Sequence, residues 1–483
     1  MKNGKWKIPS FSPFFKDQLQ RTHNASLEIL ERTGVEFHSE RARDILRGEG
    51  AIIRDPPLVK FPPDVVERAI RNAGNRLVIS NRKGKRKMFL SSSEDRTYYG
   101  PGSDTPYTLD PYSGSRRKAE REDIARAGLI CDCLDNIDFA MSFGLASDRP
   151  KENSDCYHFE ALVRNTVKPL VITSWDREGV KYIHEMCKAV AGGASSFRQN
   201  PFLLHYIQPT SPLKHPKDSI EKLLYSVEKG IPLMYVPVPL SGGSAPIHLA
   251  GGLALANAEF LSMLVLVQAI EKGTPLVYGA SPAAMDMKTA ITPYGAPETF
   301  LARCARVSMG HFYELPAFGT AGATDSKTLD LQTGLEMGSS LMVQTLCGSD
   351  IIHDIGYLDS GNTSSLPLLV VGNEMVGLVR RFTEGASFTD DEFSVDLIDE
   401  IGPGGNFLAS KNTAENFKEI SWDPELMDRR TFESWNKEGN KSLIDKAHQK
   451  TRKILENYES PKLASDVSSR LEEILNEGDR NRS

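Results

Sequence analysis

The chain has 483 residues and a mass of 53.5 kDa, enough for one large barrel with an appendage or for two to three ordinary domains. Hydrophobic residues make up 40% of it and charged residues 25%, a balance that excludes a wholly disordered or collagen-like chain. The net charge is -6 at pH 7, so the composition gives no general affinity for nucleic acid.

The amino terminus and the cysteines predict a cytoplasmic protein. Residues 1–10 carry positive charge but no apolar run, so we expect no secretory signal. The six cysteines are few and scattered, which favours reduced thiols over a disulfide framework.

Residues 1–115 are expected to form a cap of helices with a small β-element. Apolar residues recur at helical spacing in three short stretches, and the pattern then changes to two strands joined by a turn at Lys83 and Gly84. The expected helices are 18–33, 41–47 and 63–72, and the expected antiparallel strands are 76–80 and 87–90.

Residues 116–421 repeat one theme, a short apolar or β-branched run followed by a helical run. Eight such units in about 300 residues predict an α/β fold, a (β/α)8 TIM barrel, as the catalytic domain. A doubly wound sheet is the less favoured alternative, because no Gly-x-Gly-x-x-Gly follows the first strand. The expected strands are 137–145, 169–175, 202–208, 232–240, 275–280, 316–321, 350–356 and 405–409.

The most membrane-like stretch is 253–270. Asn257, Glu259 and Gln268 interrupt it, and a carboxylate is costly inside a membrane, so we expect a buried helix of the protein core. The tail, residues 422–483, is charged and helix-forming. It is interpreted as a peripheral helix pair, with a partner contact or an oligomer arm as the alternative.

Aromatic residues recur at the predicted carboxyl ends of the strands, where barrel enzymes place their chemistry. Rings converging on one mouth would hold a cationic ammonium group, although strands also favour aromatic residues for packing alone. We predict that Tyr98 or Tyr99 and at least two of the strand-end rings line one cavity and bind substrate. The strand-end rings are Phe143, Trp175, Tyr206, Tyr278, Phe318 and Tyr357.

Familiar catalytic motifs are missing from the sequence, and His353 is the best polar candidate because it ends the seventh strand beside an acid. Cys131 and Cys133 are interpreted as structural, so no metal site is expected. Lys327 is interpreted as an exposed helix-entry lysine rather than a Schiff-base lysine. Gly242 and Gly243 either form a turn or let a planar cofactor approach the backbone.

Four segments in order resemble the trimethylamine methyltransferase (MttB-like) family: 100–106 (GPGSDTP), 239–243 (PLSGG), 322–327 (GATDSK) and 348–353 (GSDIIH). The similarity extends from the cap to Asn412 and Thr413. The archaeal members carry pyrrolysine in the barrel mouth, and this chain has none, so it is similar to the branch that demethylates quaternary amines such as glycine betaine.

The resemblance implies methyl transfer from a quaternary amine, glycine betaine first, to the cob(I)alamin of a separate corrinoid protein, giving dimethylglycine. Cobalamin would be carried by that partner, and the chain is expected to be a homo-oligomer. Contacts to the cofactor, or to a substrate carboxylate, are expected from Gly242, Gly243, Asp325, His353 and Asn412.

Three alternatives stay open within this resemblance. The donor is another quaternary amine, such as proline betaine, carnitine or γ-butyrobetaine. The chain is instead a barrel that binds a betaine or docks a corrinoid protein without catalysis. The last alternative is a zinc-dependent methyltransferase, in which Cys131 and Cys133 would be ligands.

Overall fold

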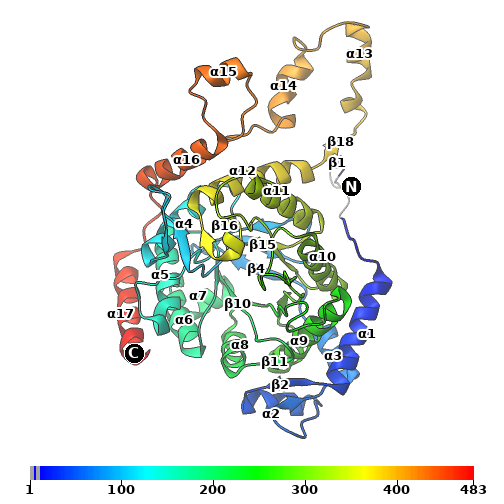
Figure 1. The fold of residues 1–483 in the computed structure, drawn as a ribbon, viewed down its shortest axis with the longest axis vertical. Coiled ribbons are helices and arrows are strands. Elements are labelled where there is room, and N and C mark those ends of the chain that lie inside the picture. The colour runs from blue at the N-terminus through cyan, green and yellow to red at the C-terminus, as the bar shows by residue number, and fades with distance from the viewer. Residues whose placement is uncertain (1–4, 7–10, 483) are drawn as a thin grey trace.

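Short strands in the middle of the molecule are surrounded by helices (Figure 1). The computed structural model describes residues 5–6 and 11–482. Residues 1–4 and 7–10, most of the segment expected to lack a secretory signal, lie outside the described residues, as does Ser483.

The central strands are parallel and form two sheets. The first has the order β13-β12-β10-β9 and the second the order β14-β15-β6. A parallel bridge between Tyr278 and Ala317 joins the two sheets. Residues 138–140 contact both outer strands, because the Asp138 amide donates to the Tyr99 carbonyl at 2.7 Å and Ala140 pairs with Leu170. The strands are β6 (Tyr98–Tyr99), β9 (Leu170–Ile172), β10 (Leu203–Ile207), β12 (Leu233–Tyr235), β13 (Leu276–Tyr278), β14 (Phe318–Thr320) and β15 (Ile351–His353).

Six of the expected strands are confirmed, since β9, β10, β12, β13, β14 and β15 lie within the ranges predicted for them. The range 137–145 forms no regular strand and joins the neighbouring strands through the bridge at Ala140 and the Asp138 hydrogen bond. The strand expected at 405–409 is wrong, because these residues form turns and a loop between two helices. β6 lies beside β15 instead, and its two residues are too short a run to stand out in the sequence.

Helices follow the strands along the chain, as expected. Asp176 and Asp330 cap two of them by accepting the amide hydrogens of Gly179 and Thr333. The helices are α4 (Arg121–Cys133), α5 (Ser154–Asn165), α6 (Arg177–Ala191), α7 (Ala194–Gln199), α8 (Lys217–Lys229), α9 (Leu249–Ile270), α10 (Pro297–Phe312), α11 (Leu331–Leu346) and α12 (Leu366–Thr383).

The buried helix expected at 253–270 is confirmed as α9. It is long and apolar enough to cross a membrane, but 83% of its most apolar window is buried inside the protein. Its buried residues pack in one cluster with α1 (Lys16–Arg32), α2 (Glu40–Gly48) and α3 (Pro63–Asn72), which are the three helices expected in the cap.

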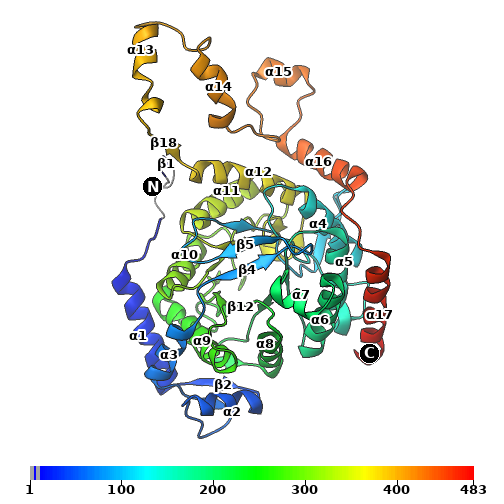
Figure 2. The ribbon, with the colours of Figure 1, turned by 180° about the vertical axis from the view of Figure 1, so that it is seen from behind.

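The expected antiparallel hairpin is confirmed as β4 (Leu77–Ser80) and β5 (Arg86–Leu90). The Ser80 amide donates to the Pro201 carbonyl just before β10, which places the hairpin at the amino ends of the strands. Figure 2 shows β4 and β5 in front of the strands from that side. The hairpin's apolar side chains pack with those inside the strands, so this end is closed and the opposite end is free for a site.

Smaller elements complete the fold. They are the strands β1 (Lys5–Trp6), β2 (Val35–Phe37), β3 (Leu58–Val59), β7 (Tyr107–Leu109), β8 (Arg116–Lys118), β11 (Lys214–His215), β16 (Tyr357–Leu358), β17 (Thr363–Ser364) and β18 (Ala386–Ser387), and the 3-10 turns at 151–153, 359–361 and 391–393.

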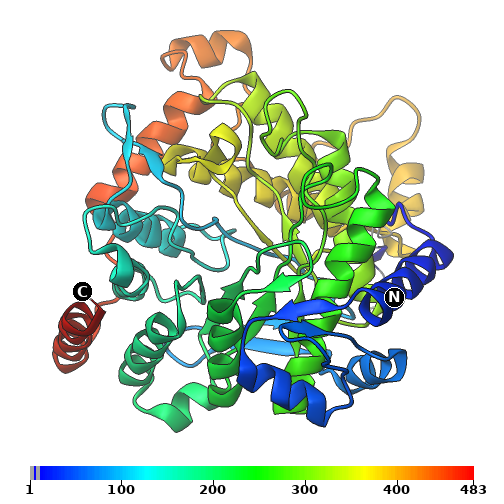
Figure 3. The ribbon, with the colours of Figure 1, turned by 60° about the horizontal axis from the view of Figure 1, so that its bottom comes forward.

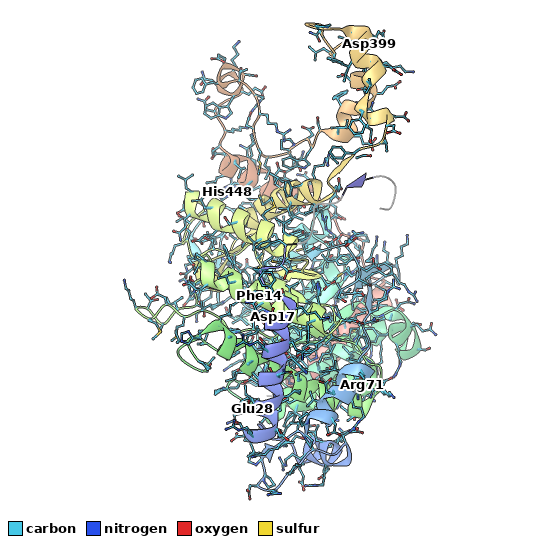
Figure 4. The ribbon with its side chains drawn as sticks, turned by 90° about the vertical axis from the view of Figure 1, so that its right-hand side faces the viewer. Phe14, Asp17, Glu28, Arg71, Asp399 and His448 are labelled. Atoms are coloured by element: carbon cyan, nitrogen blue, oxygen red, sulfur yellow. The ribbon has the colours of Figure 1, made fainter. Side chains whose placement is uncertain are left out.

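Residues 388–442, which we call the arm, stand away from the body except around Leu426, which is buried in the core and whose amide donates to Glu374. The arm holds α13 (Val395–Ile401), α14 (Lys411–Ile420) and α15 (Phe432–Lys437), none with a buried residue. Figure 4 places Asp399 at its far tip. The chain then returns to the body in α16 (Leu443–Asn457) and α17 (Ser465–Arg482), the tail helices expected there, and α17 lies across the molecule from α1 (Figure 3).

Candidate active site

A cavity of about 580 Å³ lies at the carboxyl ends of the strands. Residues at or after β6, β9, β10, β12, β13, β14 and β15 line it, together with residues of α8 and α10. The polar and aromatic side chains among them are Ser103, Asp104, Thr173, Ser174, Tyr206, Gln208, Lys222, Thr292, Tyr294, Thr299, Arg303, Arg306, Phe318, Thr320, His353, Asp354, Tyr357 and Ser360.

One wall of the cavity is aromatic. The rings of Tyr206 and Phe318 meet edge to face, with centroids 5.9 Å apart. His353 lies against both, with its ring centroid 4.4 Å from Phe318 and 5.9 Å from Tyr206. Tyr357 also lines the cavity, and the Phe143 ring stacks on it at 5.8 Å. These ring faces suit a quaternary ammonium group, which offers no hydrogen-bond donor but carries positive charge.

His353 ends β15 and is 9% exposed. Its Nδ1 lies 2.9 Å from Asp354 Oδ1, yet the two atoms are not aligned for a hydrogen bond, and Nδ1 has no partner in the described structure. A buried ring nitrogen without a partner is uncommon and leaves His353 able to bond a ligand.

Two carboxylates face the same cavity. Asp104 accepts hydrogen bonds from the hydroxyls of Thr173 at 2.6 Å and Ser142 at 2.9 Å. Asp354 lies close to Gly102, where an added Cβ would come 2.3 Å from its Oδ1. The loop 100–106 therefore needs glycine at position 102 to pass beside the site.

Tyr294 is a site residue that strand-end reasoning missed. It comes from the loop after β13, and its backbone amide and that of Gly295 donate to the Asp325 carboxylate at 2.8 and 2.9 Å. Ser360 donates to the same carboxylate at 2.7 Å. Asp325, which is expected to contact a cofactor, anchors this loop in the structure.

Three buried cations also line the cavity and were missed. Arg303, Arg306 and Lys222 are 6%, 4% and 8% exposed. Burial lowers the pKa of each, that of Arg306 to about 10. Two arginines three apart in an otherwise apolar helical run are a signal in the sequence that could have identified two of them.

The other predicted rings lie elsewhere. Tyr98 packs among the hairpin side chains, and its hydroxyl oxygen accepts from the Phe89 amide. Tyr99 lines a second cavity of about 1150 Å³, away from the first. Tyr278 donates to Asn257 between the strands and α9. Trp175 is 48% exposed and donates to Ser154. Alternation along a strand explains why Tyr98 and Tyr99 lie on opposite sides of β6, because neighbouring residues point to opposite faces, whereas Trp175 lies beyond the end of β9.

The remaining cofactor candidates are spread out. Gly242 has a φ of 84°, so it is needed for the turn, and an added Cβ would lie 3.1 Å from Ile247. Gly243 follows it, and neither glycine lines the cavity, although Leu240 does. Asn412 lies on α14 in the arm, away from the site. Lys327 is exposed and donates to the Asp325 carbonyl.

No group of three His, Cys, Asp or Glu side chains is placed to hold a metal ion among residues 5–6 and 11–482. Cys131 and Cys133 both lie on α4, and burial raises the pKa of Cys131 to about 12. A thiolate ligand is therefore disfavoured at that residue, since a metal binds the deprotonated form.

Comparison with known proteins gives the family. The family model described as trimethylamine methyltransferase (MTTB) matches residues 1–481. Trimethylamine methyltransferase MttB of Desulfitobacterium hafniense is 31% identical over 466 residues, which cover 96% of this chain and 93% of the relative. Glycine betaine methyltransferase of the same species, strain Y51, is 28% identical over 472 residues, which cover 97% of each chain.

A solved structure agrees with the fold. The monomethylamine methyltransferase MtmB of Methanosarcina barkeri superimposes with a TM-score of 0.52 at 15% identity, covering 93% of this chain and 90% of that one. Because the family model spans nearly the whole chain, the chain belongs to the trimethylamine methyltransferase (MTTB) family, a family of methyltransferase enzymes.

Proposed function

We propose that this chain transfers a methyl group from a quaternary amine, glycine betaine first, to the cob(I)alamin of a separate corrinoid protein. The observation that carries the proposal is the cavity itself, which joins ring faces of Tyr206, Phe318 and Tyr357 with the carboxylates of Asp104 and Asp354. Membership of the family supports the reaction, and the relative named glycine betaine methyltransferase supports the donor.

The chemistry needs positioning more than proton transfer. In the transfer the carbon–nitrogen bond of one methyl group breaks, its electron pair stays on nitrogen, and the carbon bonds to cobalt(I) of the partner's corrinoid. The leaving group is a neutral amine, dimethylglycine when glycine betaine is the donor. Holding the methyl carbon in line with its acceptor can lower the barrier by several kcal/mol, up to roughly 7–11 in ideal cases.

Each wall has a role in this proposal. The rings of Tyr206, Phe318 and Tyr357 hold the ammonium head through its methyl groups. His353, between two of these rings, is the proposed catalytic residue that contacts the substrate or the incoming corrinoid ring. In this proposal Gly242 and Gly243, in the turn after β12, contact the corrinoid ring outside the cavity.

The same proposal covers the architecture. The strands, linked by the bridges at Tyr278 and Ala140 and by the Asp138 to Tyr99 hydrogen bond, form a (β/α)8 barrel that includes β6 from the cap. The MtmB fold supports this architecture. Exposed apolar residues in the loops after β12 and β13, namely Ile247, Met287 and Ile291, offer the corrinoid protein a docking rim.

Three further parts of the proposal concern the protein's setting. It works in the cytoplasm, with cobalamin supplied by its partner. It forms a homo-oligomer, and the exposed apolar residues of the arm support this. The cavity of about 580 Å³ falls within the range usual for small-molecule sites, so proline betaine, carnitine and γ-butyrobetaine belong in the substrate test.

The deciding experiment is a panel of amines mixed with the enzyme and cob(I)alamin, scored by the absorbance change on methylation. Conversion of glycine betaine to dimethylglycine supports the proposal. Tight binding of a betaine with no methyl transfer to cob(I)alamin or to a corrinoid protein would favour the non-catalytic alternative. Metal analysis of the same sample addresses the zinc alternative, since stoichiometric zinc would make Cys131 and Cys133 candidate ligands again.

A further inference from the structure

We infer that Arg303 and Arg306 form an anion subsite that binds the carboxylate of the methyl donor, so that the enzyme selects zwitterionic betaines over simple ammonium cations. The inference rests on the proposed function for the identity of the donor. It adds the residues that recognise the end of the substrate that does not react.

The two guanidinium groups come from one helix and reach one place. They are three residues apart on α10, so they share a face of that helix, and both line the cavity. Arg306 is held by the hydroxyls of Ser281 and Thr320, at the ends of β13 and β14. Arg303 lies over the Tyr294 ring at 4.8 Å.

Neither arginine has a carboxylate in direct contact, although the nearby Asp354 raises the pKa of both. Within the described residues no carboxylate oxygen lies within 4.0 Å of either guanidinium, and their hydrogen bonds go to neutral groups. Arg303 makes only one such bond, from Nη1 to the Tyr294 carbonyl at 3.4 Å. Most of its donors are therefore left for a ligand.

Two adjacent buried positive charges are unfavourable unless an anion joins them. Each charge lowers the pKa of a neighbour, and Arg303 does so for Arg306 after burial itself. A carboxylate with two oxygens matches the fork of a guanidinium and removes the repulsion. An anionic group of the substrate is thus the partner that this pair lacks.

The rest of the cavity carries the opposite charge. Asp104 and Asp354 follow β6 and β15, whereas Arg306 bonds to the ends of β13 and β14. The aromatic wall of Tyr206, Phe318 and His353 connects the two regions, and Arg306 lies 5.1 Å from the Phe318 ring centroid. A molecule with a methylated ammonium at one end and a carboxylate at the other fits a cavity that carries carboxylates and guanidinium groups at different strand ends.

The test compares two ligands with the same cation. Choline has the trimethylammonium group of glycine betaine, but a hydroxyl replaces the carboxylate. Calorimetric titration of the wild-type protein without a corrinoid should show glycine betaine binding roughly 10- to 100-fold more tightly than choline, the gain expected from charge-assisted hydrogen bonds. Equal affinity for the two ligands, or no binding of either, would overturn the inference.

Arg303→Gln is the variant of choice, because Arg306 also holds two strand ends. The variant should lose roughly 10-fold or more in affinity for glycine betaine and keep its affinity for choline within about 3-fold. Arg198→Gln, which removes an exposed arginine of α7, is the matched control and should change neither. Equal losses for both ligands in Arg303→Gln would contradict the subsite, and if that variant does not fold, the wild-type ligand pair decides.

Methyl-transfer assays separate this inference from the proposed function. If glycine betaine binds as stated but no methyl reaches cob(I)alamin or a corrinoid protein, the subsite stands and the function fails. If choline or tetramethylammonium donates methyl groups as well as glycine betaine does, the function as a methyltransferase stands and the subsite is wrong. Acetate at millimolar concentration should compete with glycine betaine only weakly, since it lacks the ammonium end.

Discussion

At the scale of single residues, His353 combines burial with an unused hydrogen-bonding atom. Its ring packs between Tyr206 and Phe318, while its Nδ1 has no hydrogen-bond partner in the described structure. The side chain is only 9% exposed, so removing it also removes packing.

The variant His353→Ala should lower kcat/KM for methyl transfer by roughly 10-fold or more, because a contact to the reacting partners is lost. It should also cost about 1–3 kcal/mol of unfolding free energy through the cavity left between the rings. Both are measured, by the cob(I)alamin assay and by urea unfolding. His38→Ala, at a surface histidine paired with Glu36, is the control. A transfer rate equal to that of the wild type would remove His353 from the site.

The raised pKa of Glu259 predicts that the stability of the fold depends on pH. It is fully buried on α9 and accepts from the Ser211 hydroxyl and the Leu213 amide, and burial raises its pKa to about 7. The folded pKa lies above the unfolded one, so the group's stabilising contribution is complete below about pH 4.5 and is lost as the pH rises toward 7.

Compared with Glu259→Gln, the wild type should therefore lose about 1–3 kcal/mol of unfolding free energy between pH 4.5 and pH 7. Urea unfolding of both proteins at the two pH values measures it, and the difference cancels the buried histidines common to both. If the difference in unfolding free energy between the wild type and Glu259→Gln is the same at both pH values, the raised pKa is contradicted. A wild type that gains stability relative to the variant as the pH rises would also contradict it.

At the scale of elements, loops that carry no repeating pattern build much of the site. The loop 100–106 passes so close to the site that a Cβ at Gly102 would lie 2.3 Å from Asp354 Oδ1 and 2.4 Å from the Tyr357 hydroxyl.

Gly102→Ala should reduce substrate affinity and cost about 1–3 kcal/mol in stability, because the side chains of Asp354 and Tyr357 must shift. Gly334→Ala is the control, since nothing lies within 4 Å of a Cβ there in α11. Equal behaviour of the two variants would show that the loop has room.

The loop that carries Tyr294 depends on one carboxylate. Asp325 accepts hydrogen bonds from two backbone amides of the loop and from the Ser360 hydroxyl. Asp325→Ala should therefore release the loop and raise KM for the amine roughly 3- to 30-fold, with a smaller change in kcat. Asp286→Ala, in the same loop, removes only local turn hydrogen bonds and should leave KM unchanged. Kinetics with glycine betaine measure both, and a KM for Asp325→Ala equal to that of the wild type would contradict the anchoring role.

The strands that repeat along the chain could be predicted from the sequence, whereas β6, Tyr294 and the two arginines of the cavity could not. Six strands could be located because each is a short apolar run followed by a long helical run. β6 has only two residues, and its pairing with β15 joins parts of the chain about 250 residues apart, which no local pattern reports. Tyr206, Phe318, Tyr357 and His353 could be placed at one end of the strands by position alone. Tyr294 and the two arginines lie on a loop and a helix, where strand-end reasoning does not look.

At the scale of the whole molecule, the arm exposes more apolar surface than a monomer needs. Its helices bury no residue, and Leu408, Phe417 and Phe432 are 80%, 51% and 69% exposed. Apolar side chains that are this exposed gain little from their own chain, beyond local contacts such as that of Phe432 with Trp435 (Figures 1 and 4). Contact with a second copy of the chain would bury them, as the proposed homo-oligomer requires.

Light scattering after size exclusion at micromolar concentration should therefore give the wild type a mass that is a multiple of 53.5 kDa. The double variant Leu408→Asp with Phe417→Asp should give the mass of the monomer. Because both side chains are exposed in the arm, its melting temperature should stay within a few degrees of that of a dilute wild-type sample. Ile52→Asp, at a 44% exposed apolar residue outside the arm, should leave the oligomer intact. Because the arm starts where α12 ends, far from the cavity mouth, the monomeric variant should still bind glycine betaine. A wild type that is a monomer, or a double variant with the wild-type mass, would mean that the arm does not hold copies of the chain together.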